Sequence, residues 1–91
     1  MTVYVLSRYW DTPDNEGHDV LGVFANREDA VDFMHKDANA TKAYYNGFGE
    51  NYWDDDMTWE SDTEIHMGRA AESSSLYATI YDWEITEHEV I

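Results

Sequence analysis

The amino-acid sequence predicts an α+β fold: an antiparallel four-stranded sheet in the order β-β-α-β-β, with one helix packed on a face. Three observations carry this prediction. Two runs of β-branched and aromatic residues flank a turn-forming cluster, which is typical of a hairpin. A stretch with helical spacing of apolar residues follows at 26–38, and segments with strand character follow at 57–67 and 76–86. A chain of 91 residues is expected to form a single domain, 1–91.

The first hairpin is predicted from residues 2–10, TVYVLSRYW, and residues 18–25, HDVLGVFA. Both faces of the first segment are largely apolar, so we expect a central strand rather than an edge strand. The connecting cluster at 11–17, DTPDNEG, combines Pro, Asp, Asn and Gly, which are the residues that turns prefer.

A helix is predicted to begin within two residues of Arg27. Asn26 is a favourable N-cap, Asp29 stands three residues later as in a capping box, and Glu28 lies in the first turn, where the helix dipole favours an acid. An apolar stripe follows at Ala30, Val31, Phe33, Met34 and Ala38. The helix is expected to weaken at Asn39, with an extension through 43–44 left open, before the loop NGFGEN at 46–51.

Two further strands complete the predicted sheet. Residues 57–67 alternate between apolar and acidic side chains, which predicts one strand with a buried face and an acidic face. A turn is expected at 68–75, a last strand at 76–86, and a frayed tail at 87–91. The residues expected to be mostly buried are Val3, Val5, Val23, Phe24, Ala30, Phe33, Met34, Ile65, Leu76 and Ile80.

The charge of the chain constrains its partners more than its fold. Twenty Asp and Glu stand against five Lys and Arg, a formal net charge of −15. The second half is the more acidic, since Arg69 is its one basic residue. Such a chain repels nucleic acid and anionic membranes and attracts basic surfaces. The aromatic fraction of 15% is far above that of disordered acidic tails, so we expect a folded protein.

Several classes of protein are disfavoured by what the sequence lacks. Without Cys there is no disulfide framework and no thiolate metal site. No segment reads as a signal peptide or as an apolar stretch of about 20 residues, so we expect a soluble cytoplasmic protein, in the host cell cytoplasm if phage-encoded.

Acidic and aromatic residues gather at 52–64, which predicts a partner-binding surface there. Glu60, Asp62 and Glu64 would lie about 6.6 Å apart along one strand face. Because DNA carries one phosphate per about 3.4 Å of each strand, such carboxylates could imitate a short phosphate row. The competing interpretation is a solvated face that keeps the sheet soluble. The residues predicted to bind a partner are Tyr52, Trp53, Asp54, Asp55, Asp56, Trp59, Glu60, Asp62 and Glu64.

The motifs of catalysis and metal binding are missing. The acidic run DDDMTWE does not match a calcium-binding loop, and His18, His35, His66 and His88 form no zinc-binding pair. Neither a nucleophile elbow nor a phosphate-binding loop is present. The sequence therefore predicts no enzyme, no cofactor and no metal site.

Part of the chain resembles a group of small phage and bacterial domains that share a VYVV…GVF…EA opening and a late strand with alternating acids. The resemblance covers about the first 35 residues and the last strand. The matching residues are Val3, Tyr4, Val5, Gly22, Val23, Phe24, Asn26, Glu28, Ala30 and Ile85. It implies a fold and almost nothing about function. By size and charge, the chain is also similar to phage-encoded inhibitors that imitate DNA, including anti-CRISPR proteins.

Together these observations lead to one hypothesis and one alternative. The hypothesis is a non-enzymatic binding protein that occupies a basic, nucleic-acid-binding surface of a partner protein, as a phage-encoded inhibitor of a host defence nuclease would. It would not bind nucleic acid or membranes itself. The alternative is a structural or accessory protein, able to form a homodimer through its aromatic residues, whose acidity serves solubility or salt adaptation.

Overall fold

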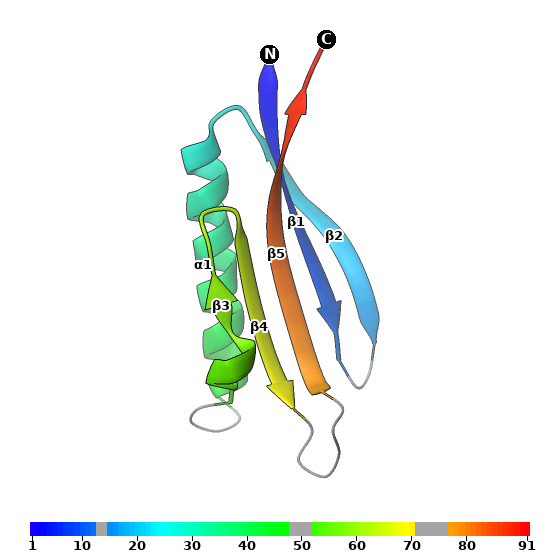
Figure 1. The fold of residues 1–91 in the computed structure, drawn as a ribbon, viewed down its shortest axis with the longest axis vertical. Helices are drawn as coiled ribbons and strands as arrows, with labels where there is room; N and C mark the ends of the chain where they lie inside the picture. Colours follow the sequence, from blue (N-terminus) through cyan, green and yellow to red (C-terminus); the bar gives the residue numbers. More distant parts are fainter. Residues whose placement is uncertain (13–14, 48–51, 71–76) are drawn as a thin grey trace.

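The fold consists of one long helix against a curved antiparallel sheet (Figure 1). It is described by a computed structural model over residues 1–12, 15–47, 52–70 and 77–91. The described residues form five strands in the spatial order β2-β1-β5-β4-β3. The α+β class is therefore confirmed. The predicted four strands in the order β-β-α-β-β are corrected to five, because the segment at 57–67 is divided between two strands.

The first hairpin and the last strand form the centre of the sheet. β1 (Thr2–Asp11) pairs with β2 (Glu16–Phe24) on one side and with β5 (Tyr77–Glu89) on the other, so β1 is central, as predicted. The expectation of a frayed tail is wrong. The pairing of β1 with β5 runs from Asp11 opposite Ile80 to Thr2 opposite Glu89. Because β1 begins at residue 2, it supplies backbone partners for β5 as far as Glu89.

The predicted strand at 57–67 is instead a short helical turn followed by a hairpin. A 3-10 helix, η1 (Asp55–Met57), leads into β3 (Trp59–Glu60), and β4 (Glu64–Ala70) returns beside it. The small polar residues at 61–63 form the turn, in which the Ser61 N–H donates to the Glu64 carbonyl at 2.7 Å. A period of two is the same in one long strand and in two strands joined by a tight turn, so the alternation could not distinguish them.

The helix begins where the sequence predicts and continues further than expected. α1 (Arg27–Asn46) has Asn26 at its N-cap position in an extended conformation. Asn26 makes no side-chain cap with the helix backbone; its side-chain amide instead donates to Asp29 Oδ2 at 3.3 Å. Three buried residues four positions apart, Ala30, Met34 and Ala38, form the face that contacts the sheet.

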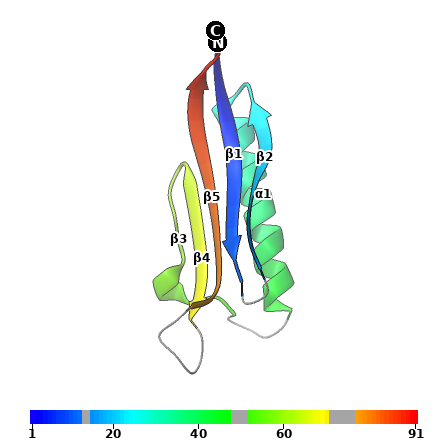
Figure 2. The ribbon, with the colours of Figure 1, turned by 90° about the vertical axis from the view of Figure 1, so that its right-hand side faces the viewer.

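The core lies between α1 and the sheet face that α1 covers. Figure 2 shows α1 on one side of the sheet, with η1 and β3 on the other side of the view. The buried apolar residues in the described part of the chain are Leu6, Ala30, Met34, Ala38, Trp53, Ile65, Met67, Trp83 and Ile85. Ala30, Met34 and Ile65 are thus confirmed as core residues, whereas Leu76 lies outside the described residues.

Two residues expected in the core are exposed. Val23 is 62% exposed because it lies on the sheet face opposite α1, paired with Val5. Phe33 is 42% exposed because it lies at the edge of the helix stripe, where its ring contacts Phe24 at a centroid distance of 5.7 Å. The remaining expected core residues are half-buried: Val3, Val5, Phe24 and Ile80. Because the described residues include one α-helix to cover the sheet, only one face of the sheet becomes core.

A polar network fixes α1 to the two central strands. Asp37 Oδ2 accepts hydrogen bonds from Arg8 Nη1 of β1 at 2.9 Å and from Trp83 Nε1 of β5 at 2.8 Å. The Arg8 guanidinium also lies 3.8 Å from Asp19 of β2 and 5.3 Å from the ring centre of Trp10. One helical carboxylate therefore anchors the helix to β1 and β5.

Candidate functional site

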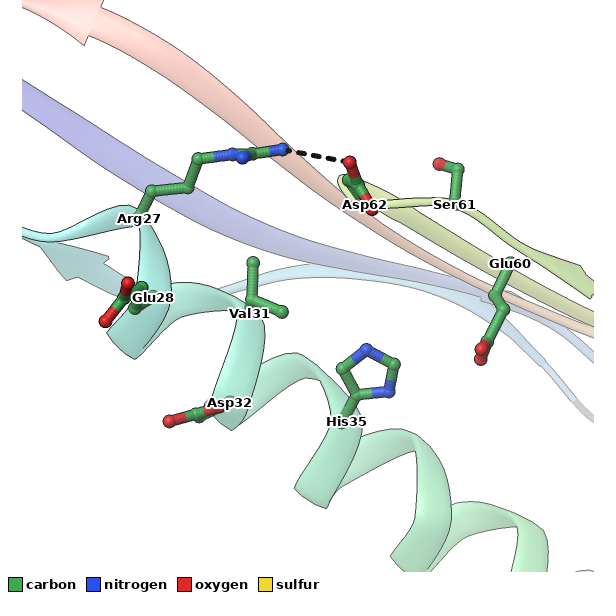
Figure 3. Close-up of a pocket in the computed structure, with 8 residues that line it drawn as sticks. All are labelled: Arg27, Glu28, Val31, Asp32, His35, Glu60, Ser61 and Asp62. Atoms are coloured by element: carbon green, nitrogen blue, oxygen red, sulfur yellow. Dashed lines mark ion pairs between the residues drawn. The ribbon is translucent and has the colours of Figure 1, made fainter.

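A groove of about 670 Å³ separates the N-terminal half of α1 from the turn between β3 and β4. We call it the acidic groove. Its helix side carries Arg27, Glu28, Val31, Asp32 and His35, and its hairpin side carries Glu60, Ser61 and Asp62. In Figure 3, Val31 and His35 point toward the hairpin and Glu60 points back toward His35. Glu28 and Asp32 lie on the side of the helix away from Glu60, where they form the outer rim.

The acidic groove has an excess of negative charge. Four carboxylates face one guanidinium, which leaves three uncompensated charges with His35 neutral. Arg27 Nη2 lies 3.8 Å from Asp62 Oδ2, across one end of the groove. These side chains are 49% and 92% exposed, so their ion pair is weak and a competing cation can displace it.

The acids predicted from the sequence do not form one row. Glu60 and Asp62 line the acidic groove, whereas Glu64 lies on the opposite face of the sheet, directly across from Glu84. The turn at 61–63 causes this separation. Asp55 and Asp56 are exposed on η1, and Asp54 is half-buried, with its backbone N–H donating to the Gly68 carbonyl at 2.9 Å.

The predicted aromatic contacts lie in different environments. Trp53 is 6% exposed and belongs to the core. Tyr52 is half-buried: its hydroxyl lies 2.8 Å from Thr79 Oγ1 and the Arg69 guanidinium lies 4.4 Å from its ring centre. Trp59 is 49% exposed and stacks on His66 at a centroid distance of 5.6 Å. Of these three side chains, Trp59 is the one most available to a partner.

A second set of carboxylates, which the sequence did not reveal as a group, lies on the sheet face opposite α1. Glu64 and Glu84 are cross-strand neighbours, and Asp82 is paired with His66 in the adjacent position. Burial, followed by repulsion from Glu64, raises the pKa of Asp82 to about 6, although His66 Nδ1 at 3.9 Å partly opposes the shift. The sequence shows that acidic residues alternate with Trp83 at 82–84. The strand pairing that brings Glu64 close to them exists only in the tertiary structure.

The crowding of Asp82 predicts that mild acid stabilises the fold. Because its pKa is higher when folded, ionised Asp82 destabilises the folded state, and this destabilisation disappears as pH falls through about 6. As the pH falls from about 7.5 to about 5, we expect the free energy of unfolding, measured with urea at constant ionic strength, to rise by about 1 kcal/mol. This value is smaller than the pKa shift alone would give, because the carboxyl is partly exposed and solvent screens its interactions.

Two substitutions test whether Asp82 causes the rise in stability at lower pH. Asp82→Asn should be more stable than the wild type near neutral pH and should lose most of the rise, because it cannot ionise. Asp62→Asn is the matched control, since that side chain is 92% exposed and should leave the rise intact. A wild-type stability that falls steadily from neutral pH to about pH 5 would mean that the carboxylates are paired rather than crowded.

Comparison of the chain with protein-family models, curated proteins and solved structures finds no match. Within the described ranges, no set of three or more His, Asp or Glu side chains is arranged to hold a metal ion. A search of the same residues finds no helix long and apolar enough to cross a membrane.

Proposed function

We propose that this protein is a non-enzymatic binding protein that occupies a basic, nucleic-acid-binding surface of a partner protein. The observation that carries the proposal is the acidic groove, an open recess with Glu60 and Asp62 of the hairpin on one side and Glu28 and Asp32 of α1 at its outer rim, which together leave three uncompensated charges. A recess of this kind fits lysine or arginine side chains that project from the partner. Steering by the net charge of −15 would make the association fast and sensitive to salt.

The positions of the basic side chains support the same proposal. Arg8 is three-quarters buried in its network with Asp37, and Arg69 donates to the Tyr52 carbonyl at 2.9 Å while lying over the Tyr52 ring. These two guanidinium groups are used inside the fold and do little to neutralise the surface. The outer carboxylates therefore keep their charge available for a partner.

The more specific form of the proposal is a phage-encoded inhibitor that takes the place of DNA on a defence nuclease. Its support is the small size, the charge and the resemblance of the opening and last strand to phage and bacterial domains. The phosphate row is not imitated by consecutive residues of one strand. Instead, the imitation would be formed by charges from two elements, Glu28 and Asp32 of α1 and Glu60 and Asp62 of the hairpin.

Two triple variants with equal charge test the proposal. The groove variant Glu28→Gln, Asp32→Asn, Glu60→Gln and the control variant Glu16→Gln, Glu87→Gln, Glu89→Gln each remove three exposed carboxylates. A partner is first isolated from host lysate and its affinity for each variant is then measured by calorimetry. We expect the groove variant to lose about 10- to 100-fold in affinity and the control less than about threefold, because steering depends on total charge and docking on local charge.

Competition with DNA provides the decisive measurement. Duplex DNA should displace the protein from the isolated partner, and binding should weaken steeply as salt rises from low to moderate concentration. The proposal fails if the partner holds DNA and this protein at once, or if both triple variants bind equally. A third variant carries Asp54→Asn, Asp55→Asn and Asp56→Asn. If it still binds the partner, η1 lies outside the surface that contacts the partner.

A further inference from the structure

The sheet face opposite α1 is not covered by any helix of the described chain, apart from the place where Met57 of η1 lies against Gly68. The residues that point to this face are identified by the register of the strands. Leu6 is buried under α1, so its neighbours Val5 and Ser7 point to the opposite side, together with the residues paired with them on β2 and β5. We call this side of the sheet the open face.

One half of the open face is apolar. Val5 pairs with Val23, and Val20 lies farther along β2, opposite Ser7. Val20 and Val23 are 59% and 62% exposed, while Val3 and Val5 are half-buried. These four residues form the valine strip, which runs along β1 and β2.

The other half of the open face is acidic. Following one cross-strand row, Val20 lies opposite Ser7, Ser7 opposite Glu84, and Glu84 opposite Glu64. Glu64 and Glu84, together with Asp82 in the next row, form the carboxylate strip. The strip therefore contains one buried carboxylate oxygen, Asp82 Oδ1, that the described residues leave without a hydrogen-bond partner.

The Lys and Arg residues of the chain all lie away from this face, on which His66 Nδ1 lies 3.9 Å from Asp82. Arg27, Lys36 and Lys42 belong to α1. Arg8 contacts Asp37 of α1, and Arg69 contacts Tyr52, which packs against the core. These five are all the Lys and Arg in the chain, so an ammonium or guanidinium group that would complement the carboxylate strip has to come from outside.

We propose that the open face is a second docking surface, which binds a cationic amphipathic helix of a partner protein. Three strand spacings, about 14 Å, separate the β2 and β4 ends of the row. A helix with its side chains is about 10–12 Å in diameter, so one laid along β1 and β5 reaches both strips at once. Its apolar stripe would cover the valine strip and its flanking lysines or arginines would meet Glu84, Asp82 and Glu64.

Other occupants fit this face less well. A second copy of the chain would bring another carboxylate strip and another net charge of −15, with no base to place between them. Nucleic acid would be repelled by the same charges. This proposal concerns a different face from the acidic groove and does not depend on the function proposed for it.

A pair of synthetic peptides tests the second surface on the intact protein. The probe is a helical peptide of about 18 residues, five turns, made of leucine and lysine with all leucines on one side. The control peptide has the same composition in scrambled order, so it carries the same charge without an apolar stripe. In an NMR titration, we expect the amphipathic peptide to bind about tenfold more tightly, with amide shifts along β1, β2 and β5 and at Glu64 of β4.

Substitutions on the two strips separate apolar from charged contacts. Val20→Thr with Val23→Thr keeps the branched shape at two exposed positions and should abolish the preference for the amphipathic peptide. Glu64→Gln with Glu84→Gln should weaken both peptides several-fold at low salt. A double variant at the rim of the acidic groove, Glu28→Gln with Asp32→Asn, removes the same charge and should leave the preference unchanged.

Three results would overturn the proposal. The first is equal affinity for the two peptides, which would mean non-specific attraction by the net charge. The second is a set of amide shifts confined to α1 and the β3–β4 turn. The third is self-association of the free protein that Val20→Thr with Val23→Thr abolishes, which would show that a second copy occupies the face.

Discussion

Replacing Trp83 with Ala is expected to reduce the free energy of unfolding by about 3–5 kcal/mol, the range for a large aromatic side chain removed from a core. Trp83 is fully buried in β5, between Arg8 of β1 and Ile65 of β4. Its ring stacks on Tyr81 at a centroid distance of 5.7 Å, and its indole N–H donates to Asp37. The substitution removes apolar contacts and a helix anchor together, so it combines two destabilising effects.

Urea denaturation of three variants separates these contributions. Trp83→Phe retains a ring and removes the N–H, so its loss should be intermediate. Trp59→Ala is the matched control, because that Trp is 49% exposed and its loss should be below about 1 kcal/mol. A loss below about 2 kcal/mol for Trp83→Ala would be inconsistent with a fully buried indole at the centre of the sheet.

Replacing Asp37 with Ala is expected to destabilise the fold by about 2–3 kcal/mol, through the loss of two hydrogen bonds to one carboxylate oxygen. The variant leaves the buried Trp83 indole N–H without its acceptor and leaves Arg8 with Asp19 at 3.8 Å as its remaining ion pair. Because about a quarter of the Asp37 side chain is exposed, we expect less than the full effect of breaking a buried ion pair.

Two comparisons test the role of Asp37 by chemical denaturation. Asp37→Asn keeps an oxygen acceptor and loses the charge, so it should be less destabilising than Asp37→Ala. Asp32→Ala alters an exposed carboxylate on the same helix and should change stability by less than about 0.5 kcal/mol. Equal effects of Asp37→Ala and Asp32→Ala would show that the network contributes nothing to stability.

The sequence predicts that acidic residues form the candidate site, but it does not predict how these residues are arranged in space. The density of acids at 54–64 was evident, and Glu60 and Asp62 do line the acidic groove. Glu28 and Asp32, which form the outer rim on the helix side, indicate in the sequence only a favourable helix N-terminus and a polar helix face. No local pattern reports that a helix and a hairpin 28 residues farther along the chain lie side by side, with Asp32 and Glu60 lining one groove.

The sequence by itself determined the elements whose signals are local. The pattern of apolar residues and the turn cluster at 11–17 predict the first hairpin. Asn26 and the stripe through Ala38 predict where α1 begins, although the Asn26 side chain makes no cap with the helix backbone. The net charge of −15 and the absence of Cys were also fixed at this level. Propensity, capping and charge are properties of neighbouring residues, so they can be read without knowing the fold.

Only the tertiary structure decided which faces are buried and which charges meet. With one helix to cover the sheet, the side of Leu6 became core and the side of Val23 remained open. The turn at 61–63 placed Glu60 and Glu64 on opposite faces, and strand pairing brought Glu64 beside Glu84. Residues far apart in the chain supply each of these contacts, and a period of two or of 3.6 identifies the faces of an element without saying what will cover them.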